Sequence, residues 1–366
     1  MSIIWFIFVA IVVIGIHVLI YQKFGLKKIQ YQRSFSENIV FEGERVEMID
    51  EISNRKLLPI PWLRLESKID EHLQFRRQVE TDNEMKTEGY HRTMFSLKPY
   101  QKVRRRQSLI CTKRGYYEFK TVSLTTGDVF GIQHTNQTVQ SPATITVYPK
   151  LIHLKELPLP AYSWLGETVV RRWVMEDPFM IAGVRDYMGT DSMDAINWKQ
   201  TARLNQLQVY KRDFTADHHV MIYINFNQTE DAWRPVQNEA VLEKAISYAA
   251  SVAQYTIKNG LPTGFGCNAY TDENHREVIR IEPENSKQHI HRLMQTFAML
   301  KIGVTTHFEF FLEEDVKNRN EQTDYLLITS IVTEKMKAII QQLEALGNSV
   351  EVILLDIEQE HEKGAS

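Results

Sequence analysis

The stretch that decides the fold is His219-Val-Met-Ile-Tyr-Ile-Asn-Phe226, an uninterrupted apolar run of strand length. Such a run is typical of a strand that is buried on both faces of a parallel sheet. A helical stripe follows it and ends at Asn259-Gly260. The residues of this stripe are Leu242, Ala245, Ile246, Ala249 and Val252. A strand followed by a helix is the repeating unit of an α/β sheet.

The same alternation continues towards the C-terminus. Helices are predicted to begin after Ser286 and Thr333, which belong to residue types that cap helix N-termini. Further segments of strand length are 264–270, 278–281, 325–329 and 350–357. We therefore expect residues 216–366 to form an α/β domain with a mainly parallel sheet that is covered on both faces.

The region before this domain has a different period. Apolar and polar residues alternate between about residues 31 and 149, and turn pairs such as Arg114-Gly115 and Gly127-Asp128 separate the runs. Apolar residues of one parity are Val46, Met48 and Ile52, then Val122 and Leu124, then Ile145 and Val147. The pattern predicts an antiparallel β-sandwich-like domain over residues 22–150, and so an α+β multidomain protein.

Residues 3–21 carry no formal charge. At about 1.5 Å of rise per residue, a helix over this run nearly spans a hydrocarbon core of about 30 Å. A signal peptide is the alternative, but it needs a basic start and a small-residue cleavage site, and neither is seen. We expect residues 1–21 to be an uncleaved transmembrane anchor. Lys23, Lys27, Lys28 and Arg33 follow it, which predicts a single-pass cell-membrane protein with its soluble domains on the cytoplasmic side.

Composition excludes several classes of protein. The chain has two cysteines without metal-ligand spacing, which disfavours both a disulfide framework and a zinc site. A formal net charge of -3 argues against a basic nucleic-acid binder. The strongest local charge run, Arg104 to Arg106, has two open interpretations: contact with anionic lipid, or the solvated face of a strand pair.

Residues 151–215 form a connector that is rich in polar and aromatic side chains. It contains Gly183-Val-Arg185-Asp186-Tyr187-Met-Gly189-Thr-Asp191, then Ile196-Asn-Trp198-Lys199-Gln-Thr-Ala202-Arg203, then Leu207-Gln-Val209-Tyr-Lys211. This arrangement resembles the bacterial "domain of unknown function 58" family. Upstream, Lys113-Arg114-Gly115-Tyr116 and Val147-Tyr148-Pro149 look like the β-rich region of the same family.

The resemblance implies that the C-terminal half is similar to a von Willebrand factor type A domain. It also implies a membrane-associated protein that acts with a cytosolic MoxR-type AAA+ ATPase. Many members of the family carry two adjacent membrane helices, whereas this chain shows one hydrophobic run, so their topology does not transfer directly.

A type A domain often binds a divalent ion through a D-x-S-x-S motif and a later aspartate. The matching positions here are Asn225, Asn227 and Thr229, with Ser330 in place of the later aspartate. Because neutral amides do not offset the charge of Mg²⁺, we expect a degenerate site with no metal and no cofactor. Glu230 and Asp231 lie close enough in sequence to be alternative ligands.

The family-motif residues with possible docking roles are Gly183, Arg185, Asp186, Tyr187, Gly189, Asp191, Trp198, Lys199 and Arg203. The favoured interpretation is a latch, with a buried Trp198 and an acidic residue (Asp186, Asp191 or Asp194) paired with Arg185 or Arg203. A surface that docks a partner is the alternative, and catalysis is the third.

No sequence motif of an enzyme is recognised: there is no G-x-S-x-G elbow, no Walker A loop and no H-E-x-x-H pair. The leading prediction is a membrane-anchored protein-binding or adaptor module. The alternatives are a structural organiser of the cell envelope without an ATPase partner and, third, an unrecognised enzyme.

Overall fold

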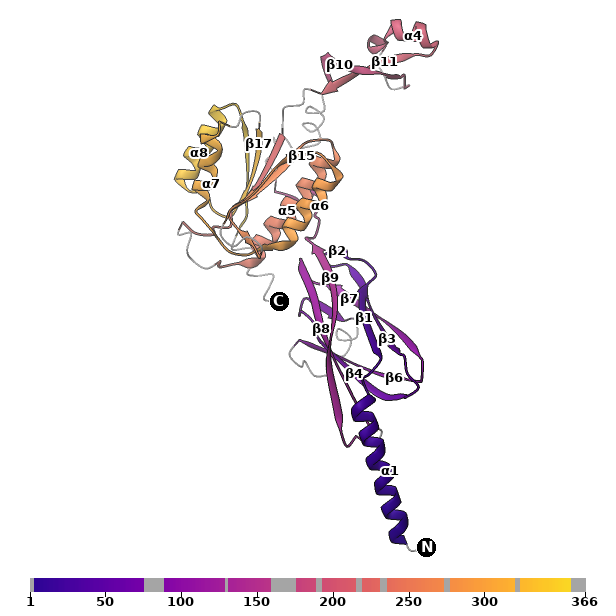
Figure 1. The fold of residues 1–366 in the computed structure, drawn as a ribbon. Helices are drawn as coiled ribbons and strands as arrows, with labels where there is room; N and C mark the ends of the chain where they lie inside the picture. The colour runs from indigo at the N-terminus through magenta and orange to yellow at the C-terminus, as the bar shows by residue number, and fades with distance from the viewer. Residues whose placement is uncertain are drawn as a thin grey trace. The chain divides into compact units, whose positions relative to one another are not determined.

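The computed structural model describes residues 3–75, 89–128, 131–158, 176–188, 193–214, 219–230, 236–272, 277–319 and 323–356, without the side chains of residues 176–182, 194 and 211–214. The chain divides into two compact units. Unit 1 contains Met1–Lys150 with Met294–Met299, and unit 2 contains Leu151–Leu293 with Leu300–Ser366. An N-terminal apolar helix, many strands and further helices confirm the α+β multidomain class (Figure 1).

Helix α1 spans Ile3–Phe24 and is almost entirely apolar. Most of its side chains are exposed, and among the described residues it is the one helix long and apolar enough to cross a membrane. By length and composition α1 fits a membrane anchor and a signal sequence equally well.

The end of α1 is built into the first unit. The Tyr21 hydroxyl donates a hydrogen bond to the Pro59 carbonyl at 3.1 Å, and Lys56 Nζ lies 2.5 Å from the carbonyl oxygens of Phe24 and Gly25. A Cβ at Gly25 would collide with the Tyr21 carbonyl oxygen and crowd the Thr126 methyl group, so only glycine fits this approach. The helix therefore passes into the β-rich domain without a free linker.

Two sheets make up that domain. The first has the order β1-β3-β7-β5 and contains β1 (Ile29–Phe35), β3 (Arg45–Asn54), β7 (Lys102–Cys111) and β5 (Leu73–Phe75). The second has the order β2-β9-β8-β4-β6 and contains β2 (Ile39–Phe41), β9 (His134–Tyr148), β8 (Gly115–Gly127), β4 (Ile60–Lys68) and β6 (Tyr90–Leu97). Every pairing in them is antiparallel except β2 with β9.

The two sheets bury their apolar faces against each other. Met48 and Leu109 of the first sheet share a cluster with Phe119 and Ile145 of the second. All seven apolar residues selected by their parity are buried, as the alternation required. The sandwich-like domain is the arrangement that this pattern predicts.

Unit 2 is built on an open sheet of order β15-β13-β12-β17-β18. Its strands are β12 (His219–Ile224), β13 (Thr263–Cys267), β15 (Ile279–Glu284), β17 (Thr323–Thr329) and β18 (Ser349–Leu354). All pairings are parallel except that of the edge strand β15, which confirms a mainly parallel sheet. Residues 219–224 are the centre of this sheet, as their uninterrupted apolar run predicted.

Helices cover both faces of this sheet. They are α5 (Glu239–Lys258), α6 (Lys287–Met299), α7 (Phe308–Lys317) and α8 (Glu334–Ala345). Figure 1 shows α7 and α8 on one side and α5 on the other. Tyr223 and Tyr325 pack against α7 and α8 in one cluster with Phe311 and Leu343. The predicted cap of α8 is confirmed, because Thr333 Oγ1 accepts a hydrogen bond from Met336 N. Helix α7 and the short pair β14 (Tyr270–Thr271) and β16 (Leu300–Lys301) were not predicted.

The connector also forms structure that its sequence did not predict. Strand β10 (Glu176–Asp186) pairs antiparallel with β11 (Gln208–Phe214). A single 3-10 turn (Met193–Ala195) and the short helix α4 (Trp198–Leu204) lie between them. We call this segment, residues 176–214, the hairpin.

Candidate functional site

The carboxyl ends of the parallel strands of unit 2 meet at one edge of the sheet. The central strand β12 has β13 on one side and β17 on the other, so the chain changes winding direction there. In open α/β sheets ligands bind outside the carboxyl ends of the strands at such a switch point. The first residues after these strands are Asn225, Asn268 and Ser330, and the two asparagines are buried.

These residues form one hydrogen-bonded network. Asn225 Nδ2 donates to Thr329 Oγ1 at 3.0 Å, and Asn225 Oδ1 accepts from the Asn227 amide at 2.9 Å. Asn227 Oδ1 accepts from Asn268 Nδ2 at 2.7 Å and from the Phe308 amide, at the start of α7, at 3.2 Å. We call Asn225, Asn227 and Asn268 the asparagine cluster.

Of the predicted metal positions, Asn225, Asn227 and Ser330 are brought together, and the side-chain oxygens of the two asparagines already accept from N–H groups. Ser330 Oγ donates to the Asn227 carbonyl at 3.4 Å, and Thr229 is half-buried nearby in sequence. No group of three metal-ligating side chains exists among the described residues, and Glu230 is exposed. A divalent cation does not fit this donor set, because it carries no carboxylate to offset the charge. Asp231 lies outside the described residues.

One polar atom of the cluster has no acceptor. Asn227 Nδ2 is buried without a hydrogen-bond partner in the structure, while Asn227 Oδ1 has two donors. The cluster is thus rich in donors, and it suits a water molecule or a carbonyl oxygen better than a cation. Asn268 was missed in the sequence, although its place directly after a strand with the same direction as β12 was a usable signal.

The hairpin is organised around its buried polar residues. Asn197 Oδ1 caps α4 by accepting from the Gln200 amide at 3.1 Å, and the Asn197 amide donates to the Gln208 carbonyl at 2.7 Å. Ile196 forms an isolated antiparallel bridge with Val209, and both are nearly inaccessible. These residues hold the hairpin together.

Trp198 is 65% exposed, so the prediction of a buried ring is wrong. It is the first residue of α4, and the inward positions before it are filled by Ile196 and Asn197. Among the residues that the structure describes, the Asp186 carboxylate does not form the expected ion pair with Arg185 or Arg203, and instead accepts a hydrogen bond from Gln208 Nε2. Arg185 Nη1 donates to the backbone carbonyl of Asp186 at 3.2 Å. The latch interpretation is therefore withdrawn for Trp198 and Asp186.

The other motif residues have mixed surroundings. Lys199 and Arg203 are exposed on α4, and Tyr187 is half-buried, its amide donating to the Leu207 carbonyl at 2.9 Å. A Cβ at Gly183 would meet nothing within 4 Å, so packing within the described residues does not require glycine there. Gly189 and Asp191 lie outside the described residues, as does the side chain of Asp194.

Six large apolar side chains of the hairpin are exposed. Trp198 is accompanied by five others with at least a third of their surface accessible. We call this set the hairpin patch: Val184, Met188, Met193, Trp198, Leu204 and Leu207. These six residues lie close together in sequence, and exposed apolar side chains that form one contiguous patch mark an interaction surface.

A family match begins at Gly183, the first residue of the motif quoted from the connector. The family model described as "Protein of unknown function DUF58" matches residues 183–364. The match thus begins at Gly183 and includes both the hairpin patch and the asparagine cluster. The DUF58 match covers most of unit 2 and does not include the β-rich domain.

Similarity to whole proteins is weaker. The chain is 21% identical over 353 residues to "Uncharacterized protein YeaD" of Bacillus subtilis (strain 168), covering 96% of this chain and 81% of that protein. Among solved structures, the CARDB domain of the PF1109 protein from Pyrococcus furiosus shares 14% identity with a TM-score of 0.22, covering 33% of this chain and 96% of that one. The ASH/PapD-like domain of human CEP192 shares 11% with a TM-score of 0.23, covering 33% and 84%. Neither structural likeness is close enough to carry an argument.

A second polar group in unit 2 is separate from the asparagine cluster. The Tyr223 hydroxyl donates to Asp315 Oδ2 at 2.8 Å, and Arg280 reaches the other oxygen of the same carboxylate. Burial raises the pKa of Tyr223 and of Asp315, the latter against the opposing charge of Arg280. Because these three side chains come from β12, β15 and α7, we infer that they hold the edge strand β15 in place.

The basic run in unit 1 is paired. Lys102 Nζ and Arg104 Nε lie 2.6 Å and 3.2 Å from the Glu51 carboxylate, and Arg106 Nη1 lies 3.5 Å from Glu47. Arg105 points to the opposite face, over the ring of Phe95. Of the two interpretations, the solvated strand pair is the one that this geometry supports.

Proposed function

We propose that this chain is a membrane-anchored adaptor of the DUF58 family whose hairpin patch docks a cytosolic protein. Its partner would be the MoxR-type AAA+ ATPase implied by the motif resemblance. The observation that carries the proposal is the exposed ring of Trp198 among five further exposed apolar side chains.

Exposed tryptophan is unusually effective in protein recognition. Trp is enriched among the few residues that dominate binding energy, and burying a ring of this size removes a large apolar area from water. Lys199 and Arg203 on the same short helix supply positive charge. A partner surface with an apolar pocket and acidic residues at its edge would complement this arrangement.

The membrane anchor is supported by the junction between α1 and the β-rich domain. Tyr21 and Leu26 are buried there, and Lys56 holds the last carbonyl groups of the helix. A signal peptidase needs a small-residue cleavage site after the apolar run, and residues 22–25 show no such pattern. Because residues 21–26 are folded into the domain, retention of α1 is the better fit. The basic residues that follow it favour a cytoplasmic domain.

A type A-like fold for unit 2 is supported by the strand order, with β12 central and one antiparallel edge strand. Asn225 and Asn227 occupy positions that the resemblance matches to the cation ligands of such domains. Since its oxygens are engaged, partner binding through the hairpin would need no metal.

The test is capture of the purified ATPase, encoded by the same genome, by the full chain in detergent. Trp198→Ala should weaken capture by about 30-fold, the effect of losing a contact worth about 2 kcal/mol. The matched control is Phe310→Ala, which truncates another exposed aromatic residue, 62% accessible, in the same unit. Capture should also differ between ATP and ADP.

Three outcomes are informative. Equal loss in both variants would mean a general defect rather than a hairpin contact. Unchanged capture in Trp198→Ala would overturn the docking site. Absence of any ATPase binding, with the chain still firmly in membranes, would favour the structural organiser of the cell envelope.

A further inference from the structure

Two turns of the β-rich domain adjoin the end of α1. The first, residues 55–59, joins β3 to β4, and the second, residues 98–101, joins β6 to β7. The Arg55 amide donates to the Lys28 carbonyl at 3.0 Å, and the Tyr100 amide donates to the Lys56 carbonyl at 3.2 Å. We call these two turns, with residues 23–28, the juxtamembrane rim.

The rim is strongly basic. Lys23, Lys27, Lys28, Arg55 and Lys98 are exposed there, and no acidic side chain within the described part of the chain forms a salt bridge with any of them. The run at Arg104 differs, because Glu51 and Glu47 pair with Lys102, Arg104 and Arg106, while Arg105 lies over the Phe95 ring. Burial lowers the pKa of Lys56, the sixth basic residue, to about 8, and its ammonium is used to hold the end of α1.

Apolar side chains stand among these charges. Leu57 and Tyr100, at the tips of the two turns, are 74% and 70% exposed, and Phe24 at the end of α1 is 43% exposed. Lys23 and Lys27 lie over the Phe24 ring, 5.9 Å and 5.1 Å from its centroid. Apolar tips flanked by lysine and arginine match a membrane interface, where the former meet acyl chains and the latter meet headgroups.

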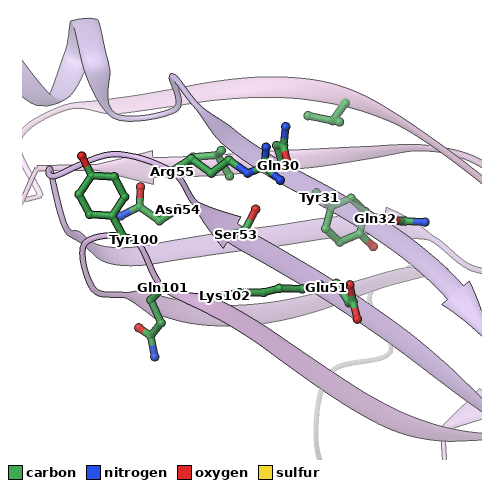
Figure 2. A pocket seen from close by; sticks show the side chains of 12 residues that line it. Gln30, Tyr31, Gln32, Glu51, Ser53, Asn54, Arg55, Tyr100, Gln101 and Lys102 are labelled. Carbon is green, nitrogen blue, oxygen red and sulfur yellow. Dashed lines mark ion pairs between the residues drawn. The ribbon is translucent and has the colours of Figure 1, made fainter.

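A cavity opens beside the two turns. It measures about 610 Å³, and its lining includes Gln30, Asn54, Arg55, Tyr100 and Gln101. Figure 2 shows these side chains around the hollow, with Arg55 and Tyr100 from different turns. Its lining includes the exposed guanidinium of Arg55, and its acidic residue, Glu51, is paired with Lys102. The cavity therefore suits a ligand that is anionic and rich in oxygen acceptors.

We propose that the juxtamembrane rim binds the headgroups of anionic phospholipids in the membrane crossed by α1. The proposal rests on the membrane anchor proposed above. Phosphate oxygens accept from the Arg55 guanidinium and the Lys98 ammonium, while Leu57 and Tyr100 enter the acyl boundary. Each basic residue close to an anionic surface contributes about fivefold to the interaction. Loss of two should therefore weaken it by about 30-fold.

The test places a fluorophore on Leu57→Cys in the full chain. Cys111 and Cys267 are buried, so the new thiol is labelled selectively. In nanodiscs of phosphatidylglycerol mixed with phosphatidylcholine, lipid-borne quenchers should quench the label, and added salt should reverse the effect. In pure phosphatidylcholine the quenching should be weak. A label on Tyr116→Cys, about ten strand residues or roughly 33 Å from the rim, should remain unquenched.

The charge dependence is tested by Arg55→Gln with Lys98→Gln, which leaves the backbone hydrogen bonds of both turns in place. This pair should shift the phosphatidylglycerol dependence by about 30-fold. Lys287→Gln with Lys335→Gln, which removes the same charge from exposed sites of unit 2, should leave it unchanged.

Equal quenching in both lipid mixtures, or none in either, would overturn the proposal. A label response to inorganic phosphate in detergent without lipid would overturn it as well, because the cavity would then be a site for free phosphate. Alkaline extraction of the same membranes separates the two proposals: a chain that washes off has lost the anchor, whereas a chain that stays but ignores headgroup charge has lost only the rim.

Discussion

Replacing Asp50 by Asn should destabilise the β-rich domain by about 3–5 kcal/mol, because it leaves a buried arginine without its counter-charge. Arg33 and Asp50 face each other across β1 and β3, and both are nearly inaccessible. Arg33 Nε lies 2.8 Å from Asp50 Oδ1, and Arg33 Nη1 donates to Ser67 Oγ at 2.9 Å. The Tyr31 hydroxyl donates to the same carboxylate oxygen at 2.6 Å, and burial raises the pKa of that tyrosine.

A double-mutant cycle separates the interaction energy of the Arg33–Asp50 pair from the effect of losing each residue alone. Arg33→Met with Asp50→Leu removes both charges and keeps the volume, so it should be much less destabilised than the sum of its single variants. In the double variant the hydroxyls of Tyr31 and Ser67 each lose a hydrogen-bond partner, and each loss should lower the free energy of unfolding by about 1 kcal/mol. Glu47→Gln, on the opposite parity of β3 and paired only at the surface, is the control and should change little.

Hydrogen exchange of the intact chain is the suitable assay, since a two-unit protein does not unfold in one step. The amides of β1, β3 and β7 should exchange faster in Asp50→Asn, while those of β12 and β17 keep their protection. A loss below about 1 kcal/mol in the single variant, or a double variant as damaged as the sum, would refute the view that this pair is a buried and coupled unit.

Two further predictions concern unit 2. Burial, reinforced by the charge of Glu351, raises the pKa of Asp324 to about 8. The folded state therefore holds a proton that the unfolded chain releases above about pH 4, and the stability from this group is lost as pH rises from about 4 to about 8. Asp324→Asn should flatten that fall in a series of thermal melts, and an unchanged pH profile would contradict the assignment. Mg²⁺ or Mn²⁺ should leave the melting temperature unchanged, because the side-chain oxygens of Asn225 and Asn227 are already hydrogen-bonded. A saturable rise in melting temperature that disappears in Asn225→Ala would show a real metal site. At a hundredfold excess over Kd, such binding would add about 2.7 kcal/mol to the free energy of unfolding.

Periodicity predicted the β-rich domain and the parallel sheet because both depend on which residues are apolar. The same alternation contained a signal that was not used: Asp50 shares the parity of Val46, Met48 and Ile52, which face the core. A charged residue at a core position predicts a buried partner. The partner itself, Arg33, depends on the register between β1 and β3, and strand register cannot be read from one sequence.

The hairpin was harder to predict for a different reason. Within the described residues its two strands join no other named strand, and its core is Ile196 and Val209 rather than a periodic stripe. A tryptophan surrounded by charges is compatible with burial and with exposure, since composition does not reveal which side of a short helix faces inward. The cap at Asn197 determines that Trp198 is exposed. Because α4 begins at residue 198, the buried positions are those of Ile196 and Asn197, which directly precede the helix.

The junction at Gly25 has a mechanical consequence for an adaptor. A flexible linker after a membrane helix lets a domain tumble, whereas here Tyr21 and Lys56 join the helix end to the turn between β3 and β4. With α1 anchored as proposed, Lys23, Lys27 and Arg55 would lie at a fixed distance from the membrane surface, and so would the tips at Leu57 and Tyr100. An adaptor anchored as proposed would orient its β-rich domain through the membrane itself. Insertion of a flexible glycine–serine segment after Gly25 should therefore abolish lipid contact at Leu57 while α1 stays in the bilayer.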